Sequence, residues 1–212
     1  MNPKTRRLTE SALLIALGTV LALLTNYIPF LNLPYGGSVT IFSMVPLIIL
    51  SYRYGIGWGF FSGVLQMALG LTTGVFSGAE FYVVVFSILL DYLLAYGVIG
   101  LAGMFKNRIK NPFVSVGLGS LIVCVLRYIA HLVSGALLFG SYAEWYFTES
   151  GFPADAGASI LGSFSGTALS WVYSVIYNAM YMVPETVITV VGAVLIMAVP
   201  AIRGRAMSAD RT

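Results

Sequence analysis

The sequence predicts an all-α membrane protein with six transmembrane helices and both termini in the cytoplasm. Hydrophobic residues make up 58% of its 212 residues and charged residues only 9%, whereas a typical soluble domain is about 25% charged. At roughly 20 residues per transmembrane helix plus connections, the length allows about six helices. Ten of the eleven Lys and Arg residues lie in short patches between apolar stretches, the pattern of positively charged cytoplasmic loops.

The first predicted helix spans residues 8–27 and follows the basic residues Lys4, Arg6 and Arg7. A basic patch before an apolar run also occurs in secretory signal peptides. Cleavage of a signal peptide requires small residues soon after the run, and the chain instead continues TNYIPFLNLPYGG. We therefore expect a retained first helix whose N-terminus lies in the cytoplasm.

The segment after the first helix is rich in residues that disfavour regular helix, namely Pro29, Pro34, Gly36 and Gly37. The second predicted helix covers residues 39–52, and Pro46 within it predicts a kink or a re-entrant start. A tight turn at Arg53 leads to the third predicted helix, residues 58–71, whose many small residues permit close helix packing.

The second half of the chain predicts three longer helices. The fourth covers residues 81–105 and is followed by a basic turn, and the fifth covers residues 113–139. The longest connection, residues 140–166, is acidic and contains no Lys or Arg. The sixth helix covers residues 170–199 and is followed by a basic tail.

The basic patches alternate with uncharged or acidic connections in a way that fixes the predicted topology. They lie at the N-terminus, after the second and fourth helices, and at the C-terminus. Six helices place all four patches on one side of the membrane, whereas five or seven would place one on the other side. Residues 1–212 are thus predicted to form a single six-helix transmembrane domain, too short for a transporter with two repeats of several helices.

Four polar residues in apolar surroundings form the candidate site: Asp91, His131, Tyr173 and Asn178. Asp91 lies about eleven residues, or roughly 16 Å, from the outer end of its helix, and the other three lie at a comparable depth. Ionisable groups within a membrane usually mark a site. Together with aromatic side chains on the same side, which attract cations, these groups suit a polar, cationic, aromatic ligand. The aromatic residues are Tyr92, Tyr128, Phe139, Tyr142, Trp145, Trp171, Tyr177 and Tyr181.

Simpler interpretations exist for each of these residues. Asp91 is also explained by an ion pair with Arg127 that holds the fourth and fifth helices together. His131 alone is also explained by a hydrogen bond between helices. Trp145 and Trp171 fit the aromatic belts found at membrane surfaces.

The sequence contains no signature of a common enzyme class, such as HExxH, GxSxG or a P-loop. Ser134 lies three residues from His131, a spacing that arises by chance in any helix. The single cysteine, Cys124, excludes an internal disulfide and a CxxC motif. The basic residues flank apolar segments and form no basic face. We therefore expect no catalytic residue, no metal, no cofactor and no nucleic-acid partner, and a channel is disfavoured because no selectivity filter is evident.

Four segments together resemble a known family, the thiamine-specific substrate-binding (S) components of energy-coupling factor (ECF) transporters. They follow the order of the family's helices and span nearly the whole chain: RRLTESALLIALG (6–18), LLDYLLAYGVIGLAGMF (89–105), LRYIAHLVSGALLFGSYA (126–143) and YSVIYNAMYMVPE (173–185). The resemblance implies a subunit of the bacterial plasma membrane that captures extracellular thiamine. A transmembrane coupling protein and two cytoplasmic ATPases then drive uptake.

The resemblance also assigns roles to residues. Asp91 matches the acidic residue near the thiazolium ring. The residues that match polar contacts to the ligand, mostly to its aminopyrimidine, are His131, Tyr173 and Asn178. Tyr92 and Phe139 match flanking aromatic positions. Ala12 and Ala16 match an AxxxA pattern that docks the coupling protein.

The chain departs from the family pattern at several positions. Gly37 and Gln66 stand near positions where some members carry Trp, and Asp91 replaces a Glu of some members. Three alternatives to a thiamine-specific S component remain: an S component for riboflavin or a pyrimidine precursor, a secondary carrier or channel that works alone, and a membrane enzyme or purely structural subunit. A carrier transports without ATPases, whereas an S component requires them.

Overall fold

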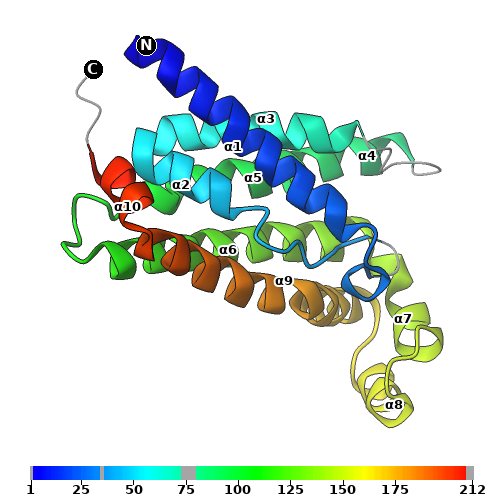
Figure 1. The fold of residues 1–212 in the computed structure, drawn as a ribbon. Coiled ribbons are helices and arrows are strands. Elements are labelled where there is room, and N and C mark those ends of the chain that lie inside the picture. Colours follow the sequence, from blue (N-terminus) through cyan, green and yellow to red (C-terminus); the bar gives the residue numbers. More distant parts are fainter. Residues whose placement is uncertain (1, 34–35, 73–79, 209–212) are drawn as a thin grey trace.

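The computed structural model describes residues 2–33, 36–72 and 80–208 as a bundle of helices (Figure 1). Within these ranges the regular elements are helical, apart from an isolated antiparallel bridge between Asn32 and Ser38. Pro34, one of the residues expected to disfavour helix, lies outside the described residues. Residues 73–79, in the connection after the third predicted helix, lie outside them too.

Helix α1 (Pro3–Thr25) lies along the outside of the bundle (Figure 1). It begins earlier than predicted because the Asn2 side chain caps it and a proline occupies its first turn. At its other end, Asn32 Nδ2 donates hydrogen bonds to the carbonyl oxygens of Thr25 (3.1 Å) and Ile28 (2.9 Å). The chain therefore turns back at once, through the short 3₁₀ helix η1 (Pro29–Leu31).

Helix α2 (Val45–Tyr54) begins at Val45 and not at residue 39, so the prediction for its start is wrong. Phe42 adopts a left-handed conformation (φ 59°), which a continuous α-helix does not allow. The Phe42 ring packs against Gly192 of the last long helix, in the space that a side chain at residue 192 would fill. This packing keeps the segment out of the helix. At 1.5 Å per residue α2 is about 15 Å long, or half of a hydrocarbon core of roughly 30 Å.

Helix α3 (Ile56–Leu71) follows α2 through Gly55, whose φ of 91° makes the tight turn. The fourth predicted helix is a continuous rod, Phe81–Gly103, with changes of winding inside it. Its consecutive pieces are α4 (Phe81–Ser87), the π-helix η2 (Ile88–Leu94), α5 (Ala95–Gly97) and the 3₁₀ helix η3 (Val98–Gly103). The π-helical piece contains Asp91, and such wide turns are frequent at functional sites.

Helices α6 (Pro112–Leu138) and α9 (Gly166–Ala198) run side by side (Figure 1). The connection between them contains three short helices that the sequence analysis did not predict: η4 (Gly140–Tyr142), α7 (Ala143–Glu149) and α8 (Ala154–Ser163). The basic tail forms α10 (Pro200–Met207) against the end of α2. Each of these elements has ten residues or fewer, too few to show a clear helical repeat.

Four helical segments among the described residues are long and apolar enough to cross a membrane: α1, the rod Phe81–Gly103, α6 and α9. The second and third predicted spans correspond to α2 and α3, which are shorter. The start of α1, the turns after α2 and η3, and α10 meet at one end of the bundle, where together they line a pocket. Helices α7 and α8 lie at the opposite end (Figure 1).

Close packing of the rod against its neighbours depends on glycines. A Cβ atom at Gly119 of α6 would overlap the carbonyl oxygen of Ala102, and one at Gly63 of α3 would overlap that of Tyr96. These overlaps involve backbone atoms, which cannot move aside as a flexible side chain can. Gly117, two residues before Gly119, has only an ordinary contact with Val194 Cγ2 at 3.4 Å.

We expect Gly119→Ala to lower the free energy of unfolding by about 1–3 kcal/mol because the added methyl group overpacks the contact between α6 and η3. Gly117→Ala is the matched control, and its melting temperature should equal or exceed that of the unsubstituted protein because alanine favours helix. Thermal melts of the purified proteins in detergent measure both effects. Equal melting temperatures for the two variants would contradict this account of the packing.

Candidate functional site

Asp91 lies where the π-helix η2 faces α6, and both of its carboxylate oxygens have partners there. Oδ1 is 2.8 Å from Nδ1 of His131, and Oδ2 accepts a hydrogen bond from the Ser134 hydroxyl at 2.5 Å. His131 and Ser134 are three residues apart and so share one face of α6. The Asp91 and His131 side chains are 19% and 12% exposed. The carboxylate is therefore held in a fixed orientation in a largely dry setting.

The predicted ion pair between Asp91 and Arg127 is not formed, so that interpretation is wrong. Arg127 Nη1 lies 3.6 Å from Oε1 of Glu185 in α9, and the same nitrogen contacts the sulfur of Met44. Both side chains of this pair are less than a tenth exposed. Arg127 precedes His131 by one helical turn. Glu185 therefore pairs with α6 one turn away from the position where Asp91 pairs with His131.

Asn178 connects α9 to the same part of α6. Its Nδ2 donates to the carbonyl oxygen of Ser174 (2.8 Å) and also lies 3.3 Å from that of His131. Its Oδ1 accepts a hydrogen bond from the Tyr181 hydroxyl at 2.7 Å. The Tyr181 ring packs edge-on against the His131 ring, with centroids 5.9 Å apart. Asp91, His131 and Asn178 are thus brought together as predicted from their depth.

Tyr173 and Phe139 lie in an adjoining aromatic cluster. Tyr173 is buried beside Tyr146 of α7 and Tyr177, with ring centroids 5.3 and 5.5 Å away. Phe139 packs at the edge of the same cluster, directly after α6. Burial raises the pKa of Tyr146, so its hydroxyl stays protonated.

Tyr92 follows Asp91 in η2 and is partly buried. Among the described residues, the His, Cys, Asp and Glu side chains form no group of three or more that could hold a metal ion. The chemistry of the site is therefore that of one oriented carboxylate, an imidazole, an amide and several aromatic faces. Such groups bind and orient a ligand, and cations are attracted to both the carboxylate and the rings.

The segment between α1 and α2 is attached to α9 by polar contacts that the sequence analysis missed. The Thr40 hydroxyl donates to Glu185 Oε1 at 2.6 Å, and Ser43 donates to Thr40 at 2.6 Å. The Tyr177 hydroxyl donates to the carbonyl oxygen of Gly36 at 2.7 Å. Glu185 was visible in the sequence as the one acidic residue within the last apolar stretch, whereas Ser134 and Thr40 gave no signal above the many other hydroxyl residues.

The two departures from the family's Trp positions, Gly37 and Gln66, lie in different places. Gly37 (φ 83°) faces the Tyr181 ring, where a Cβ would meet ring carbons at 2.8–2.9 Å, so a larger side chain requires Tyr181 to move. Gln66 is buried in α3 against Gly18 of α1. Only Gly37 of the two borders the hydrogen-bonded group, through Tyr181.

The fold and the site define a multi-pass helical membrane protein with a polar, aromatic-lined site between its long helices. A family model described as thiamine transporter protein (Thia_YuaJ) matches residues 8–145. The thiamine transporter ThiT of Bacillus subtilis (strain 168) is 34% identical over 204 residues, covering 92% of each chain. The chain therefore belongs to the thiamine transporter protein family.

Two further similarities extend this comparison. A solved structure of ThiT from Listeria monocytogenes matches the fold with a TM-score of 0.65 at 21% identity, covering 95% of this chain and 98% of that one. The uncharacterized protein YybS of Bacillus subtilis is 27% identical over 120 residues, which are 56% of this chain and 34% of that protein. Membership of the family makes the chain a transport protein of the cell membrane and not an enzyme.

We expect Glu185→Ala to lower the free energy of unfolding by about 3–5 kcal/mol because it leaves the Arg127 guanidinium buried without its partner. The double substitution Arg127→Met and Glu185→Leu removes both charges and should recover most of the loss. Chemical denaturation followed by tryptophan fluorescence compares the three proteins. If the double variant were no more stable than Glu185→Ala, the loss would reflect packing and not an unpaired charge.

Proposed function

We propose that this protein binds extracellular thiamine as the S component of an ECF transporter. The observation that carries the proposal is the Asp91 carboxylate, oriented by His131 and Ser134 and adjoined by the aromatic cluster around Tyr146. Thiamine is permanently cationic at its thiazolium ring, so a dry carboxylate and aromatic faces supply what the ligand needs. The family membership agrees with this ligand.

We assign the aminopyrimidine of thiamine to the polar groups beside Asp91. This ring has hydrogen-bond donors and acceptors along one edge, which His131 and the Asn178 amide can match. Their present partners are other site residues, Asp91 for His131 and Ser174 and Tyr181 for Asn178. Thiamine must therefore replace some of these contacts when it enters, and Tyr92, Phe139 and Tyr173 are proposed to contact its rings.

The proposed topology has six spans in a single domain over residues 1–212, with both termini in the cytoplasm. The gathering of all the basic segments at one end of the bundle supports it, as does the acidic connection at the other end. In this orientation, we propose that the segment that carries Gly36, Gly37 and Thr40 acts as a lid over the site. Thiamine would enter from the end that carries α7 and α8.

The proposed partners are a transmembrane coupling protein and two cytoplasmic ATPases. An S component of this kind has no ATP-binding motif of its own and must present a surface to the coupling protein. Ala12 and Ala16 lie on an exposed strip of α1 beside Leu13 and Leu17, which are 66% and 48% exposed. Small residues at this spacing let another helix approach closely, so we assign the docking surface to this strip.

We expect Asp91→Asn to weaken thiamine binding about 100-fold, or ~2.7 kcal/mol, because it removes the charge that faces the thiazolium. The matched control is Asp155→Asn, which removes an exposed carboxylate from α8 and should change affinity less than twofold. Titration with thiamine, followed by quenching of tryptophan and tyrosine fluorescence, measures both. Unchanged affinity in Asp91→Asn would refute the role of this carboxylate in binding the cation. If riboflavin or a pyrimidine precursor bound more tightly than thiamine, that compound would be the ligand instead.

We expect Ala12→Trp to leave thiamine binding intact and to abolish uptake, because the large side chain obstructs the coupling protein. Val187→Trp, at another exposed position on α9, is the control for a bulky side chain facing lipid and should still transport. Uptake of labelled thiamine by cells expressing the complete transporter measures the effect. Uptake by the protein alone, without ATPases, would instead identify a secondary carrier.

A further inference from the structure

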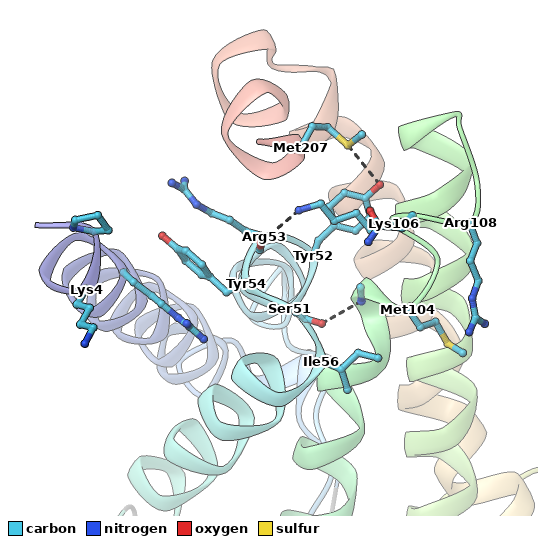
Figure 2. Close-up of a pocket in the computed structure, with 15 residues that line it drawn as sticks. Lys4, Ser51, Tyr52, Arg53, Tyr54, Ile56, Met104, Lys106, Arg108 and Met207 are labelled. Carbon is cyan, nitrogen blue, oxygen red and sulfur yellow. Dashed lines mark hydrogen bonds between the residues drawn. The ribbon is translucent and has the colours of Figure 1, made fainter. Parts of the chain in front are cut away.

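The basic end of the bundle encloses a pocket of about 640 Å³, far along the bundle from Asp91 and His131. Four parts of the chain build it: the start of α1, the end of α2 with its turn, the turn after η3, and α10. Figure 2 shows side chains from all four around the opening, including Met207 of α10. Five of the lining residues are cationic and none is acidic: Lys4, Arg7, Arg53, Lys106 and Arg108.

A carboxylate beside the pocket contacts part of this cationic group. Glu10 lies behind the wall and is shared by three groups: Arg6 at 3.1 Å, Arg53 at 3.0 Å and the Tyr54 hydroxyl. The Glu10 carboxylate therefore pairs with Arg53, which lines the pocket, and with Arg6, which lies beside it. Cations gathered around one pocket attract an anion to it.

Arg53 is the buried member of the set and still has capacity to donate. The residue is 9% exposed, and its Nη1 pairs with Glu10. Its Nε and Nη2 have no hydrogen-bond partner among the described residues, and the same is true of Nε of Arg7. A buried N–H group without an acceptor is costly, and the five donors of a guanidinium match phosphate oxygens.

We propose that this pocket binds the phosphate group of an anionic phospholipid. Arg7, Arg53 and the two cations of the turn after η3 would contact the phosphate, while Ile56 and Met104 offer apolar surface to the glycerol and upper acyl chains. Basic pockets between helix ends of membrane proteins are suited to lipid headgroups. A soluble phosphate shares the headgroup's chemistry and is the other source to be distinguished. The proposal does not depend on thiamine binding.

The test compares the delipidated protein with Lys106→Gln/Arg108→Gln, which removes two cations from the rim of the pocket. The control, Lys110→Gln/Arg205→Gln, removes two exposed cations from the same end that do not line it. Native mass spectrometry in neutral detergent counts bound phosphatidylglycerol, with phosphatidylcholine and inorganic phosphate as separate arms. Melting temperatures confirm that each variant is folded.

The wild type and the control should each bind one phosphatidylglycerol, and the Lys106→Gln/Arg108→Gln variant should bind it about tenfold more weakly. Binding of inorganic phosphate with the same loss in that variant would support the phosphate site and assign it to a soluble ligand. Equal binding of phosphatidylglycerol by all three proteins would overturn the proposal. Equal binding of phosphatidylcholine and phosphatidylglycerol by the wild type, or binding of neither phosphatidylglycerol nor inorganic phosphate, would overturn it too.

Discussion

The interior of this bundle depends on pairing polar groups that apolar surroundings would otherwise penalise. A buried charge or hydrogen-bonding group without a partner costs several kcal/mol, so each one fixes the position of the element that satisfies it. Helix α6 supplies two such groups one turn apart, Arg127 and His131. Arg127 pairs with Glu185 of α9, and His131 pairs with Asp91 of η2. The three long apolar segments are therefore held in one register by two pairs.

The same constraint places the segment between α1 and α2. This segment has little regular structure, yet Thr40 donates to Glu185 and Gly36 accepts a hydrogen bond from Tyr177. The partner of Arg127 is thus also the anchor of the segment that borders the site. The Tyr181 ring that faces Gly37 also donates its hydroxyl hydrogen bond to Asn178. The polar group around Asn178 and the segment between α1 and α2 are consequently linked through one face of α9.

The sequence made the candidate site visible because polar residues stand out in apolar stretches, and counting from the helix ends put Asp91, His131, Tyr173 and Asn178 at one depth. Pairing could not be derived in this way. Asp91 lies in a π-helical turn and faces His131, while Arg127 pairs with Glu185, and neither the winding nor the pairing is encoded in a simple spacing. The start of α2 was missed because Phe42 takes its conformation from packing on Gly192, a residue 150 positions away. Helices α7 and α8 were too short to show periodicity.

The two ends of the bundle have opposite electrostatic character, and each suits a different ligand. Glu144, Glu149 and Asp155 lie in the elements between α6 and α9, on the side where Tyr146 covers the aromatic cluster. A cation approaching this end meets negative charge first, an arrangement that raises its local concentration. The opposite end has an excess of cations around Arg53. Since like charges in one pocket repel, that excess is stable only where anions are abundant, as they are at the surface of a bilayer.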